Sequence, residues 1–283
     1  MMLKIDNIKK QYKDFQLQCS MEIPEGCITG FIGPNGAGKS TTIKAILNLI
    51  TLDDGQVQIA GKNAAELSPL ERERIGVVLP DSGFSSYFTV RDICKIMSGM
   101  YHHFNETGFR QQCKEFQIPE DKQLKEFSTG MKAKLHLLLA MSHEADLLIL
   151  DEPTAGLDVI VRDEMLNLLR DYMDAGNRSI LISSHISSDL ESICDDLYLI
   201  HQGRIILHED TDVVLSDYGT LKLSEEEYRR LDKQYILKSR KESFGYLCLT
   251  SRLPYYRKQM PSVVAEKGTI DDIITLMIRG EEV

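Results

Sequence analysis

The sequence predicts an α/β protein, and three observations support that prediction. A glycine-rich phosphate-binding motif stands between a stretch with the pattern of a strand and one with the pattern of a helix. Apolar runs of strand length then alternate with helical stretches, as in a parallel sheet covered by helices. An antiparallel pattern precedes this core, and helical stretches interrupt it at about residues 89–145. We therefore expect a P-loop core with an N-terminal antiparallel β subdomain in residues 1–215, an inserted helical lobe, and a small C-terminal α+β appendage in residues 216–283.

Length and composition indicate a soluble globular protein. The 283 residues suffice for one large core with an appendage, and 42% apolar with 27% charged residues argues against wholesale disorder. The net charge of −10 disfavours a nucleic-acid partner. The first ten residues lack a signal-peptide pattern and no apolar run reaches membrane-spanning length, so we expect that the chain does not cross a membrane by itself. The six cysteines form no C-x-x-C pair, which predicts reduced cytosolic thiols in apolar positions.

Residues 2–32 alternate apolar and polar side chains, as antiparallel strands do, with a turn near Lys13-Asp14. Tyr12 ends the first of these strands. Its ring could stack on an adenine, since every base offers a π face to an aromatic side chain. A half-exposed turn tyrosine explains the same position equally well.

The run Gly33-Pro34-Asn35-Gly36-Ala37-Gly38-Lys39-Ser40 fits G-x-x-x-x-G-K-[ST], the P-loop. A predicted buried strand precedes it at residues 28–32, and a predicted helix follows it at residues 41–47. Glycines allow the backbone N–H groups to point inward, and the positive end of the helix dipole strengthens the resulting anion site. Lys39 then supplies a point charge for terminal phosphates, and the Ser40 hydroxyl can bind Mg²⁺. The alternative, a glycine-rich turn with a chance Lys-Ser, is disfavoured by the flanking strand and helix.

The other elements are predicted from periodicity and from turn residues. Core strands are expected at residues 56–61, 74–79, 146–150 and 178–183, with a hairpin at 197–207, and core helices at 159–173 and 186–194. Lobe helices are expected from Thr89, over residues 109–116, and from Gly130 to Met141. In the appendage, short strands are expected at 221–223 and 246–249, and helices at 224–231 and 269–278.

Two carboxylates end the apolar run at residues 147–150. Asp151 at the tip of the strand can hold Mg²⁺, directly or through water. Glu152 stands one residue further and can accept a proton from an attacking water. An apolar run ending in Asp-Glu is a weak signal alone, and the preceding P-loop strengthens it.

Three further segments are weaker candidates. Ser128, Thr129 and Gly130 begin the third lobe helix and can form a second anion site, although a simple helix cap explains them better when they are read alone. Asp158 follows a tight turn and can equally be the cap of the next helix. His185 stands at the carboxyl end of a strand, where α/β sheets bind ligands, and could hydrogen-bond a γ-phosphate, although a lone histidine is usually structural.

These motifs, in this order, resemble the nucleotide-binding subunits of ABC transporters. The resemblance covers roughly residues 2–210 and rests on the ordered motifs quoted above. It implies ATP and Mg²⁺ as ligands, with Gly33 to Thr41 as the Walker A loop and Tyr12 on the adenine. It also implies that the segment from Ser128 to Met131 is the signature. The other implied roles are Walker B for Asp151, catalytic base for Glu152, D-loop for Asp158 and switch histidine for His185.

The resemblance also implies partners and a place of action. In the family, two such domains meet head to tail, and each signature completes the ATP site of the other subunit, which is the same chain or a paralogue. A transmembrane permease is the further partner, so we expect a cytoplasmic protein held on the inner face of the cell membrane through that permease. The loop at residues 80–90 is the expected docking surface, with Phe84 and Tyr87 as anchors and Phe88 packed into the lobe.

Two departures from the family pattern narrow the prediction. The signature reads Ser-Thr-Gly-Met instead of the commoner Ser-Gly-Gly-Gln, but it keeps Ser128 and Gly130. Pro80-Asp81 stands where the family has a Gln that approaches Mg²⁺, and Asp81 is a candidate oxygen ligand in its place. Both departures resemble the ABC-2-type exporter ATPases of bacteria, which handle antibiotics and small peptides.

Two other functions remain as alternatives at this point. A soluble ABC ATPase of ribosomes or DNA typically carries two ATPase domains or a long coiled coil, whereas this acidic chain has one P-loop and no long heptad run. A nucleotide-dependent regulatory module without turnover would not need Glu152. The appendage shows no catalytic constellation and is expected to serve packing or dimer support.

Overall fold

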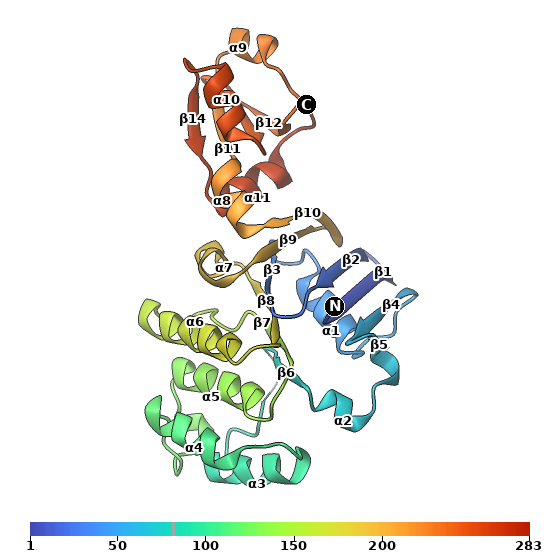
Figure 1. Cartoon of the computed structure of the whole chain (residues 1–283), viewed down its shortest axis with the longest axis vertical. Coiled ribbons are helices and arrows are strands. Elements are labelled where there is room, and N and C mark those ends of the chain that lie inside the picture. Colours follow the sequence, from blue (N-terminus) through green and yellow to red (C-terminus); the bar gives the residue numbers. More distant parts are fainter. Residues whose placement is uncertain (81–82) are drawn as a thin grey trace.

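The computed structural model describes residues 1–80 and 83–283. Figure 1 shows an elongated molecule with the appendage at one end, the helical lobe at the other, and the antiparallel subdomain beside the central sheet. Within the described residues the strands form three sheets. The predicted mixed α/β arrangement, with an antiparallel subdomain and a parallel sheet, is confirmed.

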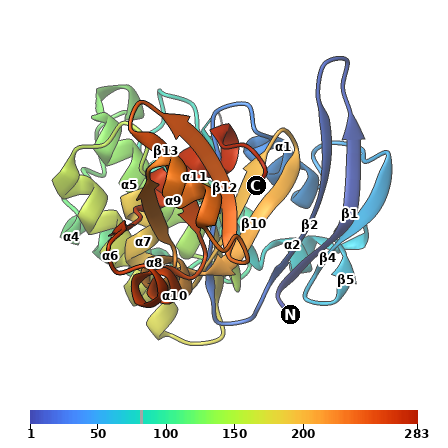
Figure 2. The ribbon, with the colours of Figure 1, turned by 90° about the horizontal axis from the view of Figure 1, so that it is seen from above.

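The N-terminal sheet has the strand order β2-β1-β4-β5 and is antiparallel. Its strands are β1 (Leu3–Gln11), β2 (Gln16–Ile23), β4 (Asp54–Ile59) and β5 (Lys62–Asn63). Along β2, buried and exposed side chains alternate, which is the pattern of a sheet with one covered face. The buried face packs with α1 (Lys39–Ile46) in one apolar cluster, which also includes one face of the central sheet. Figure 2, seen from above, shows this sheet standing beside the rest of the molecule.

The central sheet has the order β10-β9-β3-β8-β7-β6, parallel except for β10. Its strands are β3 (Ile28–Ile32), β6 (Ile75–Val78), β7 (Leu147–Asp151), β8 (Ser179–Ser184), β9 (Asp196–His201) and β10 (Arg204–Asp210). Every residue of β3, β7 and β8 is buried, as expected for central strands covered on both faces. Because these three strands are parallel neighbours, the segments that follow their carboxyl ends meet at one edge of the sheet.

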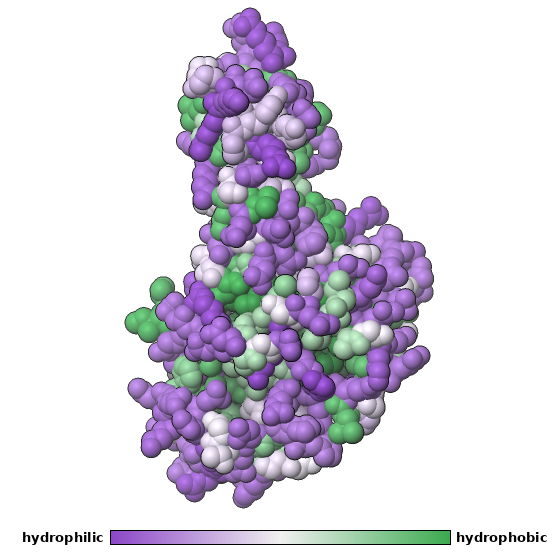
Figure 3. Space-filling model, in the orientation of Figure 1, coloured by the Kyte–Doolittle hydropathy of each residue, from purple (hydrophilic) through white to green (hydrophobic). Residues whose placement is uncertain are grey.

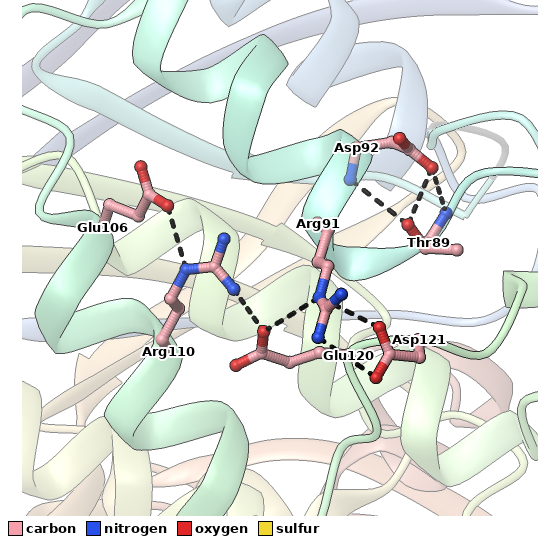
Figure 4. A network of polar contacts seen from close by, with 7 residues as sticks. All are labelled: Thr89, Arg91, Asp92, Glu106, Arg110, Glu120 and Asp121. Atoms are coloured by element: carbon pink, nitrogen blue, oxygen red, sulfur yellow. Dashed lines mark hydrogen bonds and ion pairs between the residues drawn. The ribbon is translucent and has the colours of Figure 1, made fainter.

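Helices cover the second face of the sheet and form the lobe. They are α3 (Val90–Met100), α4 (Glu106–Glu115), α5 (Thr129–Met141), α6 (Val159–Asp174) and α7 (Ser187–Ile193), with a 3-10 turn at Leu124–Glu126. A 3-10 turn at Ala64–Glu66 packs with the N-terminal sheet through Ala64 and is followed by α2 (Pro69–Arg72). Thr89 caps α3 together with Asp92, as predicted for Thr89 from the sequence. Figure 4 shows this cap beside a surface network in which Glu120 accepts from Arg110 of α4 and also faces Arg91 of α3. Such exposed pairs stabilise little individually, so the apolar cluster beneath them holds the lobe together.

The appendage has its own sheet, in the order β12-β13-β11-β14. Its elements are α8 (Thr211–Asp217), β11 (Gly219–Leu223), α9 (Glu225–Arg230), β12 (Ile236–Glu242), β13 (Gly245–Thr250), α10 (Leu253–Gln259), β14 (Val264–Lys267) and α11 (Ile270–Arg279). A separate apolar cluster lies between this sheet, α9 and α10. In contrast, Ile270, Ile273 and Leu276 of α11 belong to the main cluster together with Leu190 and Ile193 of α7. The appendage is therefore joined to the core through α11 and α7.

Candidate functional site

A cavity of about 320 Å³ opens where β3, β7 and β8 end. This is the edge at which open α/β sheets bind their ligands. The cavity is lined by Phe15, Pro34, Asn35, Gly36, Gly38, Lys39, Ser40, Thr41, Glu152, Ala155 and His185. Most of the residues that the sequence assigned to nucleotide phosphates and to catalysis therefore surround one space. Ala37, also assigned to the loop, is buried beneath it.

The P-loop lies between β3 and α1 and packs closely against Ile200 of β9. A Cβ on Gly33 would stand 2.4 Å from the carbonyl oxygen of Ile200, so a larger residue does not fit there. Gly38 has a φ of +119° and precedes α1 directly, a conformation that a side chain would strain. No side chain caps α1 within the described residues, and its first turn carries no acidic residue. The positive end of the helix dipole is therefore available to an anion in the cavity.

Lys39 is the charged group at the floor of the cavity and is only 6% exposed. Its ammonium donates to the carbonyl oxygen of Gly33 at 2.6 Å and lies 3.3 Å from Oε1 of Glu152. A buried ammonium requires such partners because desolvation of an unpaired charge is costly. Phosphate oxygens would compete with Glu152 for the same ammonium.

Glu152 is held in place by contacts at both its backbone and its carboxylate. Its φ is +53°, a left-handed conformation that is uncommon for a residue with a side chain and is found at functional sites. The backbone N–H donates to the side-chain and main-chain oxygens of Ser183, each at 3.1 Å. Oε2 accepts from the backbone N–H of His185 at 3.2 Å and lies 2.5 Å from its Nδ1. Glu152 thus joins β7, β8 and the P-loop lysine at one point.

Asp151 lies behind Glu152 and is 3% exposed. Its Oδ1 accepts from the Ser183 hydroxyl at 2.6 Å, whereas the other candidate metal ligand, Ser40, is exposed in the cavity. In the part of the chain that the structure describes, no cluster of three or more His, Cys, Asp or Glu is arranged to hold a metal. One hydroxyl and one carboxylate nevertheless fit Mg²⁺, which keeps several waters and takes further oxygens from substrate phosphates. Asp81 lies outside the described residues.

Ser128, Gly130 and Asp158 do not line this cavity. Ser128 caps α5 and accepts from the N–H of Met131 at 3.2 Å, while Asp158 caps α6 and accepts from Ile160 and Val161. The two helix starts are neighbours, since a Cβ on Gly130 would meet Val161 at 3.2 Å. Next to Asp158, the side chains of Val159 and Ile160 are 75% and 73% exposed.

Phe15 lines the cavity, whereas Tyr12, the aromatic residue expected at the adenine, does not line it. Tyr12 is 41% exposed, and its ring centroid lies 6.3 Å from that of Phe15 at an angle of 36°. The sequence analysis missed Phe15, although its alternation with Leu17 marked the start of the second strand.

A second cavity, of about 300 Å³, lies between β6, α3 and α5. Phe84 lines it and packs against the main apolar cluster, as Phe88 also does. Tyr87 is 66% exposed, and the ammonium of Lys125 lies 4.9 Å from the centre of its ring. Burial lowers the pKa of His136 and His143 on the cavity wall, so both favour the neutral form.

Within residues 1–80 and 83–283, no helix is long and apolar enough to span a membrane.

Comparison with known proteins gives a consistent result. A family model described as ABC transporter matches residues 17–155. The lantibiotic transport ATP-binding protein SrtF of Streptococcus pyogenes is 34% identical over 214 residues, which are 75% of this chain and 92% of that protein. The bacitracin transport ATP-binding protein BcrA of Bacillus licheniformis is 36% identical over 66% of this chain and 62% of its own length. A solved structure of the ATP-binding subunit of an ABC transporter has a TM-score of 0.68 at 26% identity, covering 76% of this chain and 92% of that one.

Proposed function

The chain belongs to the ABC transporter family of ATP-binding subunits, which couple ATP hydrolysis to transport, and we propose that it drives the export of an antibiotic, peptide or other amphipathic compound through a separate membrane protein. The observation that carries the ATPase assignment is the meeting of Lys39, Glu152 and His185 in one cavity. The proposed type of substrate rests on the relatives, whose names mention lantibiotics and bacitracin.

In this proposal, the P-loop N–H groups and Lys39 bind the terminal phosphates. Phosphate oxygens draw the ammonium of Lys39 away from Oε1 of Glu152, which leaves that oxygen free to accept a proton from water. His185 holds Oε2 and so keeps the carboxylate directed at the phosphate side of the cavity. Ser40 and Asp151 would hold Mg²⁺, which neutralises charge on the phosphates when bound.

The second region, with Ser128, Gly130 and Asp158, would complete the site on a second ATP-binding subunit. Next to its helix caps, the apolar side chains of Val159 and Ile160 are exposed. Exposed apolar side chains suit an interface that forms only when nucleotide is bound. The second subunit is another copy of this chain or a paralogue. ATP then stabilises the dimer because it binds the closed pair better than the separate chains.

The membrane partner would dock beside Phe84 and Tyr87, near the second cavity. Phe84 forms part of the cavity wall and Tyr87 is exposed three residues further along the chain, an arrangement suited to anchoring a partner helix. The protein would then act at the inner face of the membrane through that partner. Replacing both side chains by Ala should leave ATP binding intact and reduce co-purification with the permease. Co-purification at the wild-type yield would place the docking surface elsewhere.

Glu152→Gln tests the central assignment. Loss of a general base typically costs about 10²–10⁴-fold in rate, so turnover of ATP should nearly disappear. Binding of a fluorescent ATP analogue should remain and become tighter, because Gln removes a negative charge that faces the phosphates and pairs with Lys39. Unchanged turnover in this variant would refute the proposed role of Glu152.

A further inference from the structure

A buried hydrogen bond beneath the cavity joins the two segments that carry Glu152 and His185. The Thr154 hydroxyl donates to Oδ2 of Asp189 at 2.7 Å, across 35 positions of sequence. Thr154 is 1% exposed and Asp189 is 2% exposed. Thr154 follows Glu152 in the loop after β7, and Asp189 lies in the first turn of α7, just after His185. Each partner of this bond is therefore a near neighbour of one of the two catalytic candidates.

Burial of the Asp189 carboxylate needs an explanation, because a buried charge is costly unless it is paired. One oxygen receives the Thr154 hydrogen bond, and Oδ1 faces Nε of Arg162 at 3.8 Å. Arg162 lies on α6 and donates to the carbonyl oxygen of Leu157, in the loop that leads from Glu152 to Asp158. Asp189 also lies in the first turn of α7, where a carboxylate interacts favourably with the helix dipole. That interaction does not require burial, so it does not explain why Asp189 is buried.

The direct contact between the side chains of Glu152 and His185 lies at the cavity and is less buried than the Thr154–Asp189 bond. The side chain of His185 is 49% exposed, whereas that of Glu152 is 16% exposed. A half-exposed imidazole keeps a fixed distance to a carboxylate only if the backbone segments that carry both groups are fixed. The buried Thr154–Asp189 hydrogen bond joins those two segments.

We propose that Asp189 is a positioning residue for ATP hydrolysis. Its hydrogen bond with Thr154 and its charge beside Arg162 hold α7, and with it His185, in register with Glu152. The inference rests on the proposed roles of Glu152 and His185. Asp189 does not touch the cavity, so it acts on turnover through these two residues and has little effect on nucleotide binding.

The test is a set of variants of the full chain, assayed for ATPase kcat and KM, binding of the fluorescent ATP analogue, and Tm. Thr154→Val removes the donor at nearly constant shape, and Asp189→Asn removes the charge. Each should lower kcat about tenfold while KM for ATP stays within about twofold, because His185 and Glu152 lose their mutual alignment although the phosphate-binding groups are unchanged. Thr154→Ser keeps the hydroxyl and should retain most of the wild-type kcat.

Asp196→Asn is the matched control, because Asp196 is 8% exposed and pairs with His208 at 2.9 Å, away from the cavity. It should lower Tm without changing kcat. The double variant Thr154→Val with Asp189→Asn should be no slower than the slower single variant, because both substitutions disturb the same contact between Thr154 and Asp189. If either single variant fails to fold, the comparison of Thr154→Ser and the other single variant with wild type decides.

The outcomes separate this inference from the function on which it rests. Wild-type kcat in Thr154→Val and Asp189→Asn, with turnover abolished in Glu152→Gln, overturns the positioning role and leaves the proposed function standing. An equal loss of kcat in Asp196→Asn also overturns it, because any buried carboxylate would then serve. Wild-type turnover in Glu152→Gln instead refutes the proposed catalytic role itself.

Discussion

The residues assigned to the nucleotide fall into two regions that differ in how complete they are. At the cavity, Lys39 and Glu152 are shielded from solvent and contact each other, so one chain already brings the opposing charges together. At the starts of α5 and α6, Ser128 and Asp158 are exposed and cap their own helices. We therefore expect the cavity to bind phosphate by itself and the second region to gain a ligand only if another molecule supplies one.

This difference explains why the N-termini of the three helices are not equally available to an anion. The start of α1 lacks a side-chain cap and opens into a cavity with a lysine, while α5 and α6 have caps and open to solvent. A capped, exposed helix start satisfies its own N–H groups and needs no ligand for stability. The proposals for the two regions therefore call for separate experiments.

Lys39→Ala should have the largest effect on the cavity region. The variant removes the buried ammonium and leaves the Glu152 carboxylate facing the phosphates without a counter-charge. A charged hydrogen bond contributes about 1.5–3 kcal/mol, so affinity for ATP should fall about 10- to 100-fold. Titration of the fluorescent ATP analogue measures it, and Lys44→Ala, an exposed lysine of the same helix, is the control. Wild-type affinity in Lys39→Ala would contradict the phosphate role.

Replacing Val159 and Ile160 by Ser tests the second region. Full burial of such a side chain contributes about 1.5–3 kcal/mol, so the double variant should weaken ATP-dependent dimers at least tenfold in Kd. Light scattering with saturating ATP, in the Glu152→Gln background, measures the dimer. The control replaces Leu49 and Leu70, which are 60% and 57% exposed, in the same way. Equal dimerisation of the two double variants would exclude this face as the interface.

The same two regions show what the sequence can predict and what it cannot. The P-loop was predictable because its chemistry is local, with glycine, lysine and hydroxyl positions fixed by one short motif between a strand and a helix. Asp151, Glu152 and His185 were predictable because the ends of parallel strands must meet at one edge. Capping by Ser128 and Asp158 was the alternative that the sequence offered beside their expected ATP-binding roles, since Ser and Asp at a helix start bind backbone N–H groups.

Other features depend on contacts between distant segments, and periodicity does not reveal these. Thr154 and Asp189 show no motif, and their bond exists only because α7 returns beside the loop after β7. In the appendage, the sequence analysis missed β12 (Ile236–Glu242), because this largely polar strand depends on its pairing with β13. It also missed α10 and β14. The helices expected at 186–194 in the core and at 224–231 in the appendage are each one residue shorter at both ends in the structure.

The smallest expected effect concerns the aromatic pair at the cavity entrance. Phe15 lines the cavity and Tyr12 does not, so Phe15→Ala should weaken ATP binding about 5- to 10-fold and Tyr12→Ala less than about twofold, given that stacking on a base contributes about 1–3 kcal/mol. Phe15 also stands close to the P-loop, because a Cβ on Gly38 would lie 3.0 Å from its ring. Phe15 could therefore act by stacking on the base or by shaping the loop.

Inorganic triphosphate, which has no base, separates these two roles when it competes with the fluorescent analogue. If Phe15 stacks on adenine, triphosphate should bind Phe15→Ala as it binds the wild type. An equal loss for triphosphate would mean that Phe15 shapes the loop, and a larger loss for ATP in Tyr12→Ala would restore the family assignment of adenine to Tyr12.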